Sequence, residues 1–336
     1  MKIVVDAMGG DFAPGVVVDG AVEAAKLYNK HIILIGDETG IRSELKRHKK
    51  TGGLPLSVVN ATEVIGMGES AAESFRKKPD SSIVKGLRLL AEGKADGFFS
   101  AGHSGAIGTA ALFTLKRLDG VSRPGLATVF PTMGRPCVLI DSGANIDSKP
   151  KNLMQFAVMG TVYSRFILNN INPRVGLLSI GEEDSKGNEL TLEAFKLLKE
   201  SEINFAGNIE GRDIVRGEVN VIVCDGFVGN IVLKLSEGLA GFLVYLIKNE
   251  LKKNPLSMLA APVLQNVFKH IKKKVDYDEQ GGALLLGVNG VCVIGHGSSN
   301  AKAIKNGIRT TIEAVENNVN NHIQDEIIRM GVKNGN

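Results

Sequence analysis

Short β-branched runs alternate with longer amphipathic segments along most of the chain. Strands are expected at Lys2–Asp6, His31–Gly36, Leu56–Asn60, Asp96–Ser100, Leu126–Phe130, Cys137–Asp141, Arg174–Ser179, Ile203–Ala206, Val219–Asp225 and Val291–Gly295. Helical periodicity is clearest over Val16–Tyr28, Ser82–Glu92, Leu153–Leu168, Leu190–Lys199 and Ile304–Asn317. This alternation predicts a three-layer α/β/α fold whose sheet is mostly parallel. No linker rich in Pro, Gly or Ser divides the chain, so residues 1–336 are expected to form a single unit.

Composition narrows the class of protein. Hydrophobic residues make up 43% and charged residues 23% of the 336 residues, as in an ordinary folded globular chain. The 40 glycines are unusually many and suggest tight turns where a ligand approaches the main chain. Trp is absent and aromatic residues reach only 5%, which argues against a stacking platform for nucleic acid.

The three cysteines and the apolar stretches bear on the compartment. Cys137, Cys224 and Cys292 each lie in an apolar run without a C-x-x-C motif, so buried thiols in a reducing compartment are expected. The longest uncharged apolar stretch, Gly238–Ile247, is shorter than the ~20 residues that span a bilayer. The sequence therefore predicts a protein that is cytosolic, or that attaches to a membrane only at its surface.

Polar, glycine-rich loops follow six of the expected strands and open helices. They occupy residues 6–11, 100–105, 141–145, 179–188, 225–230 and 296–300. In open α/β sheets ligands bind beyond the carboxyl ends of the strands, where exposed N–H groups and helix N-termini favour anions. Several such loops on one edge would form one anion-binding crevice. The alternative is that Asp, Asn, Ser and Gly serve here only as turn and capping residues.

Common nucleotide and metal motifs are missing. No G-x-G-x-x-G follows a strand, since Gly102, Gly105 and Gly108 are spaced differently, and neither a P-loop nor H-E-x-x-H occurs. A nicotinamide-dependent dehydrogenase is therefore the weakest functional hypothesis.

The loop sequences resemble those of the bacterial phosphate acyltransferase (PlsX) family, in order and nearly end to end. The matching motifs are DAMGGD at 6–11, SAGHSGA at 100–106, DSGAN at 141–145, GEEDSKGNEL at 181–190, GNIEGRD at 207–213, DGFVGN at 225–230, GGALLLGVNG at 281–290 and HGSS at 296–299. The resemblance implies transfer of a fatty acyl group from an acyl carrier protein thioester to inorganic phosphate. The acyl-phosphate product would serve a membrane glycerol-3-phosphate acyltransferase in phospholipid synthesis.

The same resemblance implies further properties. The fold would be similar to those of isocitrate and isopropylmalate dehydrogenases and of phosphotransacetylases. The protein would form homodimers, associate peripherally with membrane, and use no metal or organic cofactor. Two alternatives stay open: a peripheral-membrane scaffold without turnover, and a phosphotransacylase that uses coenzyme A.

Candidate site residues follow from these motifs. Phosphate is already a nucleophile, so the site must hold it and stabilise an oxyanion. Lys186 is expected to hold phosphate and to be kept charged by neighbouring acids; the alternative is a solvated surface lysine. Asn230 is expected to donate a hydrogen bond to the oxyanion; the alternative is a helix N-cap. Further phosphate-binding candidates are Gly9, Gly10, Ser104, Gly105, Asn145, Asn188, Gly229, His296, Ser298 and Ser299. Asp6, Asp11, Asp141 and Asp225 would orient loops, because like charge repels phosphate. Catalytic roles for His103 and His296 are left open.

A basic and apolar region is expected near residues 246–275, as a helical hairpin. Between Lys248 and Lys274 seven lysines face a single acid, Glu250. The tip residues are Lys252, Lys253, Leu256, Met258, Leu259, Val263, Leu264, Phe268, Lys272 and Lys273. Lysines beside apolar side chains suit an anionic membrane surface or an acidic acyl carrier protein. Packing of the hairpin in a dimer core is the alternative.

Overall fold

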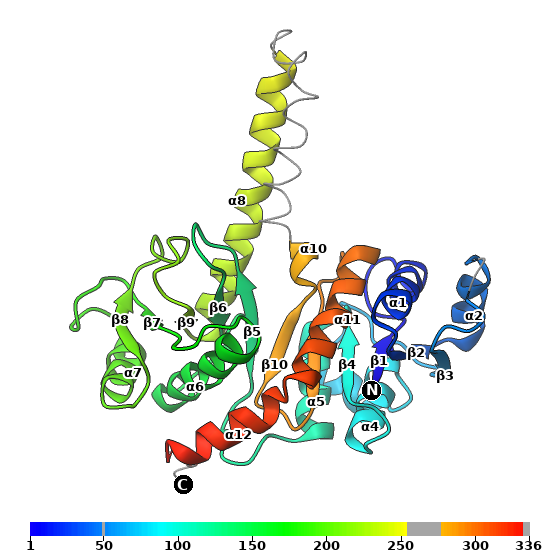
Figure 1. Cartoon of the computed structure of the whole chain (residues 1–336), viewed down its shortest axis with the longest axis horizontal. Helices are drawn as coiled ribbons and strands as arrows, with labels where there is room; N and C mark the ends of the chain where they lie inside the picture. Colours follow the sequence, from blue (N-terminus) through cyan, green and yellow to red (C-terminus); the bar gives the residue numbers. More distant parts are fainter. Residues whose placement is uncertain (49–50, 254–276, 332–336) are drawn as a thin grey trace.

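The computed structural model describes residues 1–48, 51–253 and 277–331 (Figure 1). Its strands are β1 Lys2–Asp6, β2 His31–Gly36, β3 Leu56–Asn60, β4 Gly97–Ser100, β5 Gly125–Phe130, β6 Cys137–Ile140, β7 Val175–Leu178, β8 Phe205–Ile209, β9 Val221–Val223, β10 Ala283–Leu286 and β11 Val291–Ile294. Its helices are α1 Gly15–Tyr28, α2 Glu38–Lys46, α3 Ala71–Lys77, α4 Ser82–Ala91, α5 Ser104–Leu115, α6 Pro150–Phe166, α7 Glu189–Lys199, α8 Gly226–Lys253, α10 Tyr277–Gln280, α11 Ala301–Glu316 and α12 Val319–Arg329.

The strands form one mixed sheet in the order β3-β2-β1-β4-β11-β10-β5-β6-β9-β7-β8. Apolar side chains are buried on both of its faces, as the continuous β-branched runs predict. Along β1, Ile3 and Val5 pack with α1 and α11 while Val4 packs with α4 and α5. The predicted three-layer, mostly parallel α/β fold is confirmed.

The direction of the strands corrects one expectation. β1, β4 and β11 run parallel to one another. The pairs β11–β10, β10–β5 and β5–β6 are all antiparallel, so β6, β9 and β7 run opposite to β1. The six polar loops therefore leave the sheet as two groups of three and do not share one edge. The expectation of a single row of loops was wrong because β10 was not predicted.

Helix α8 projects away from the sheet (Figure 1, yellow). In its first turns Val228 and Val232 pack against a buried cluster that includes Leu139 of β6 and Ile222 of β9. Farther along, Leu239, Phe242 and Leu243 are 51%, 54% and 56% exposed. The expected hairpin falls mostly on residues 254–276, which lie outside the described part of the chain, as do the tip residues Leu256 to Lys273.

Candidate functional site

The first group of loops is held together by the buried carboxylate of Asp6. Its Oδ2 accepts a hydrogen bond of 2.6 Å from Ser100 Oγ, which in turn accepts one of 3.0 Å from the N–H of Gly102. Burial raises the pKa of the Asp6 carboxyl, while the bond from Ser100 opposes that shift. A Cβ on Gly9 would lie 2.7 Å from Gly102 N, so this close approach requires glycine. Asp6 thereby joins the loops that follow β1 and β4.

The loop after β11 completes this group. The N–H of Asp11 donates to Gly297 O at 2.8 Å, and Gly10 lies against the same carbonyl with a φ of 103°. At the neighbouring helix α5, His103 Nδ1 accepts a hydrogen bond of 3.1 Å from Ala106 N and acts as the N-cap. Ser104 and Gly105 follow as exposed residues in the first turn of α5, where N–H groups have no acceptor within the helix and the helix dipole favours an anion.

The second group of loops centres on Asp141, which is completely buried. Its carboxylate accepts hydrogen bonds from the N–H groups of Leu126, Gly143, Ala144 and Asn145 and from the Asn145 amide, between 2.7 and 3.1 Å. Burial raises the pKa of the Asp141 carboxyl, and these donors oppose the rise. Asp141 fixes the backbone of the DSGAN loop.

Asn145 does not have the arrangement expected of a phosphate ligand. Its Nδ2 donates to Pro124 O and to Asp141 Oδ2, both at 2.7 Å, and the residue is buried. Both N–H groups of the amide are thus used within the protein. We therefore place Asn145 among the residues that hold the loop, in place of the phosphate contact expected from the sequence.

Asn230 lies in the first two turns of α8, directly above the DSGAN loop. Asp225 caps this helix by accepting bonds of 3.0 Å from the N–H groups of Phe227 and Val228. Gly229 faces Asp141 so closely that a Cβ there would lie 1.9 Å from the Asp141 carbonyl oxygen. Asn230 is exposed and packs beside Gly143, so its amide is available to a ligand at the mouth of this loop.

Lys186 lies on the loop after β7, the strand next to β9, and its side chain is exposed. Two of the three acids expected to position it are engaged elsewhere, since Glu182 pairs with Arg212 at 3.5 Å and Asp184 with Lys199 at 2.7 Å. Its carbonyl accepts a hydrogen bond of 3.0 Å from Ser179 Oγ. Asn188 caps α7 through Thr191 N. The backbone of this loop is fixed, while the ammonium group reaches into solvent.

A contact that sequence reasoning missed links the two groups of loops. Lys234, one turn after Asn230 on α8, places its Nζ 3.2 Å from His296 Nε2 in the loop after β11. His296 Nδ1 lies 2.7 Å from Ser298 Oγ, and Ser299 Oγ donates to His296 O. The only sequence signal was the i, i+4 spacing of Asn230 and Lys234, which puts both on one helix face.

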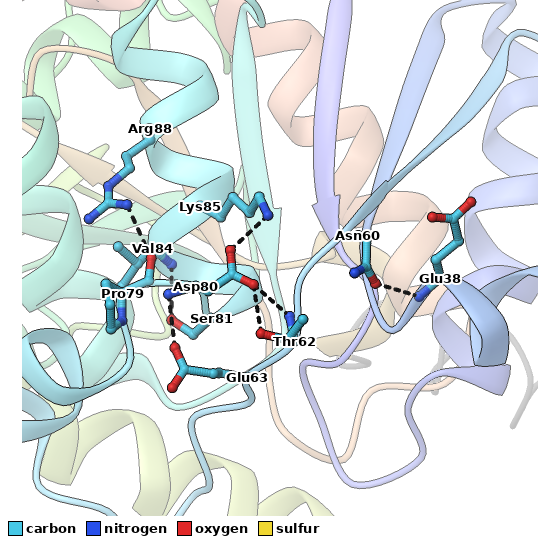
Figure 2. A network of polar contacts seen from close by, with 10 residues as sticks. All are labelled: Glu38, Asn60, Thr62, Glu63, Pro79, Asp80, Ser81, Val84, Lys85 and Arg88. Atoms are coloured by element: carbon cyan, nitrogen blue, oxygen red, sulfur yellow. Dashed lines mark hydrogen bonds and ion pairs between the residues drawn. The ribbon is translucent and has the colours of Figure 1, made fainter.

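Residues 62–81, which contain α3 and precede α4, lie next to the start of α5. Asp80 accepts hydrogen bonds from Thr62 N, Thr62 Oγ1 and Lys85 Nζ, and Glu63 accepts one from Asp80 N (Figure 2). Ala71 of α3 approaches Gly105 at the start of α5. The polar contacts join residues 62–63 to the start of α4, while α3 packs on α5 through the stacked rings of Phe75 and Phe113.

This segment is expected to loosen in acid. The Lys78 ammonium and the Gly66 N–H lower the pKa of Glu69 from 4.5 to about 2, and Lys85 lowers that of Asp80. A lowered pKa means that the ionised carboxylates stabilise the fold above their ordinary pKa and lose this effect as the pH falls. We expect the protection of backbone amides over residues 62–81 against hydrogen exchange to drop between about pH 5 and about pH 2, as the pH falls from the ordinary pKa of a glutamate to the lowered pKa of Glu69. Unchanged protection would contradict this role; Asp80→Asn should already be loosened at the higher pH.

The described cysteines are not placed for nucleophilic catalysis. All three are buried, and burial raises the pKa of Cys137 and of Cys292 to about 12 and that of Cys224 well above its ordinary value. A buried protonated thiol is a poor nucleophile. The arrangement suits direct attack by a bound anion more than transfer through a thioester on the protein.

Comparison with solved structures agrees with the fold. A phosphotransacetylase from Streptococcus pyogenes superposes with a TM-score of 0.63 over 94% of each chain at 20% identity. A 4-hydroxythreonine-4-phosphate dehydrogenase from Salmonella typhimurium gives 0.53 over 93% of this chain and 98% of its own, at 10% identity. The fold is thus that of the phosphotransacylases and related dehydrogenases.

Sequence relatives are more specific. A family model described as "Fatty acid synthesis protein" matches residues 1–322. Proteins named phosphate acyltransferase from Endomicrobium trichonymphae and Pelotomaculum thermopropionicum are 50% and 51% identical, over 99% of this chain and 99% and 97% of their own. The chain belongs to this phosphate acyltransferase family and is an acyltransferase.

Proposed function

We propose that the protein transfers a long-chain fatty acyl group from an acyl carrier protein thioester to inorganic phosphate. The observation that carries this proposal is the position of Asn230. Its exposed amide stands at the start of α8, between the DSGAN loop and the Lys234–His296 contact. Membership of the phosphate acyltransferase family supports the reaction type.

The proposed chemistry needs no nucleophile from the protein. An oxygen of hydrogen phosphate attacks the thioester carbonyl carbon, the C–S bond breaks, and the proton of hydrogen phosphate passes to the leaving thiolate. The products are acyl-phosphate and the free carrier thiol. Asn230 would donate a hydrogen bond to the oxyanion, since a neutral amide does this without changing its own protonation. Lys186 and the N–H groups of Ser104 and Gly105 would hold phosphate by charge and by the helix dipole.

The product and the surface of α8 suggest where the protein works. An acyl-phosphate is an activated acyl donor, and we propose that a membrane glycerol-3-phosphate acyltransferase consumes it to start phospholipid synthesis. Lys253, exposed at the end of α8, would belong to a basic face that meets acidic acyl carrier protein and anionic lipid. The protein would then act in the cytoplasm while bound peripherally to the membrane.

Several large apolar side chains of α8 are exposed to solvent. Within Gly226–Leu251 an 18-residue window has a mean hydropathy of 1.5, and this helix is long and apolar enough to cross a membrane by length and composition, contrary to the estimate from Gly238–Ile247 alone. Yet its first turns are tied to the protein by Val228, Val232 and Lys234. We propose that a second copy of the chain covers the exposed side chains of Leu239, Phe242, Leu243 and Leu246.

This pairing can be tested by charge. The double variant Leu239→Glu/Leu243→Glu should sediment as a monomer where the unchanged protein sediments as a dimer, because two carboxylates per helix would be buried at the interface. Leu27→Glu on α1, where the leucine is 65% exposed, is the matched control and should leave the dimer intact. A dimer that survives the double change would exclude α8 as the contact.

The identity of the acyl donor can be tested by comparing thioester substrates. Purified protein is supplied with phosphate and either palmitoyl-acyl carrier protein, palmitoyl-coenzyme A or acetyl-coenzyme A, with and without vesicles containing anionic lipid. We expect the carrier protein thioester to give the highest kcat/KM, and binding to vesicles that weakens with salt. Preference for acetyl-coenzyme A would favour a short-chain phosphotransacylase, and binding without turnover a scaffold.

A further inference from the structure

Asn208 holds the loop that carries Lys186 from the neighbouring strand. It lies on β8, the edge strand beside β7, and it is buried, with 7% of its surface exposed. Its Nδ2 donates hydrogen bonds to Glu183 O at 2.9 Å and to Lys186 O at 3.3 Å. Both partners are carbonyl oxygens, which only accept, so the amide nitrogen must be the atom that faces them. Both N–H groups of the amide are thus used on this one loop.

The backbone between these two carbonyls forms a closed turn. The N–H of Lys186 donates to Glu183 O at 3.0 Å, so Asn208 bridges both ends of the turn over residues 183–186. Ser179 Oγ adds a further donor, to Lys186 O at 3.0 Å. These bonds fix the backbone of Lys186 although its side chain is exposed.

Gly181 determines where the stem of the Lys186 side chain can lie. A Cβ on Gly181 would lie 2.8 Å from Lys186 Cγ, 3.2 Å from Lys186 Cβ and 3.0 Å from Glu183 Oε2. The φ of Gly181 is outside the left-handed region, so the space that Lys186 occupies, and not the backbone conformation, requires glycine here. The first carbons of the lysine are therefore held against this glycine.

We propose that Asn208 is a positioning residue for phosphate binding: by clamping the turn over residues 183–186 it directs the Lys186 ammonium toward the anion, and Gly181 leaves room for the stem of the lysine. The inference rests on the proposed function, in which Lys186 holds phosphate. Asn208 is buried beneath the turn and acts only through Lys186, without touching the substrate.

Stability of the sheet alone does not explain an asparagine at this position. Asparagine is depleted in strands, where apolar β-branched residues fit better. The Oδ1 of Asn208 is buried and lacks a hydrogen-bond partner among the described residues, which costs free energy. An apolar residue would avoid that cost but could not donate to the turn. The amide is explained by the loop that it holds.

The test is a double-mutant cycle on phosphate affinity, measured as the KM for phosphate and by calorimetry with inorganic phosphate alone. Lys186→Ala should weaken phosphate binding about thirtyfold, as for one hydrogen bond to a charged group. Asn208→Leu removes the donors at similar size and should weaken binding about fivefold. Its kcat should be nearly unchanged, because the lysine holds phosphate equally before and during the reaction. In the Lys186→Ala background, Asn208→Leu should change the affinity by less than about twofold, because it acts through the missing ammonium.

Asn170→Leu is the matched control for a loss of stability. Asn170 is also 7% exposed, and its Nδ2 donates to Ser164 Oγ at 3.0 Å in the connection that leads into β7, at the opposite end of that strand from Lys186. This variant should lower the melting temperature about as much as Asn208→Leu does, without changing the phosphate affinity. An equal loss of affinity in both variants would reduce Asn208 to a structural role.

Gly181→Ala tests the same clamp without removing a hydrogen bond. The added methyl group should displace the stem of Lys186 and weaken phosphate binding about fivefold, again only when Lys186 is present. Gly211→Ala, in the loop after β8, is its control, because nothing lies within 4 Å of the added Cβ. If Asn208→Leu does not fold, the cycle of Gly181→Ala with Lys186→Ala decides.

Three results would overturn the inference. They are unchanged phosphate affinity in folded Asn208→Leu, full additivity of Asn208→Leu with Lys186→Ala, and unchanged affinity in Lys186→Ala itself. If the unchanged protein binds phosphate but forms no acyl-phosphate, the proposed reaction fails, and the calorimetric cycle still decides the role of Asn208. An unchanged protein that binds no phosphate would overturn both.

Discussion

Asn230→Ala is expected to lower the kcat for acyl-phosphate formation by about 10²–10³-fold, the usual loss on removal of one oxyanion donor. Asn230 is exposed and lies beside Gly143, so removal of its amide should leave the melting temperature nearly unchanged. The KM for phosphate should change little, because the amide is proposed to act on the thioester carbonyl oxygen. Steady-state kinetics with palmitoyl-acyl carrier protein, beside thermal unfolding, would measure both effects.

Asn321→Ala is a suitable control for this prediction. Asn321 is also an exposed asparagine near the start of a helix, α12, away from both groups of loops. It should retain the activity of the unchanged protein. A kcat for Asn230→Ala within about twofold of the control would exclude Asn230 from the mechanism. A loss of activity explained by a matching fall in melting temperature would exclude it as well.

Gly229→Ala is expected to have the largest effect on stability. The new Cβ would lie 1.9 Å from the Asp141 carbonyl oxygen and 3.0 Å from Cys224 Sγ. A backbone oxygen cannot move aside as a flexible side chain can, so the start of α8 must shift away from the DSGAN loop. We expect a loss of about 3 kcal/mol in the free energy of unfolding, at the upper end for overpacking.

The same shift would displace Asn230, so activity should fall at least tenfold even in the folded variant. Thermal and urea unfolding together with the acyl-phosphate assay would report both losses. Gly238→Ala is the matched change on the same helix, because nothing lies within 4 Å of the added Cβ. It should keep or raise the melting temperature, since alanine favours helix over glycine. Equal melting temperatures for the two variants would contradict the close approach of Gly229 to Asp141.

The strands β1 and β2, which are buried on both faces, have the expected bounds because their β-branched runs leave no competing interpretation. The half-buried edge strand β3 also has the expected bounds. β10 was missed, since Ala283–Leu286 lacks β-branched residues and such a short apolar run has no periodicity of its own. It becomes a strand only by pairing with β5 and β11, which are distant in sequence. That omission also explains why the loops were expected on one edge.

In the candidate site, too, features that depend on local sequence were predicted, and contacts between distant segments were not. The motifs correctly located polar loops at strand ends, because turn and cap chemistry is local. They could not show that the Asn145 amide is used by Asp141 and Pro124, or that Glu182 and Asp184 pair away from Lys186. They also gave no sign that Lys234 meets His296. Such pairings depend on how distant segments pack.

The central claim is that phosphate itself attacks the carrier protein thioester at the start of α8. The most direct measurement is to incubate the purified protein with palmitoyl-acyl carrier protein and isotopically labelled inorganic phosphate and to analyse the products by mass spectrometry. We predict palmitoyl-phosphate that carries the label, in amounts equal to the released carrier thiol and strongly reduced in Asn230→Ala. Release of the thiol as free palmitate without labelled product, or no release at all, would contradict the account.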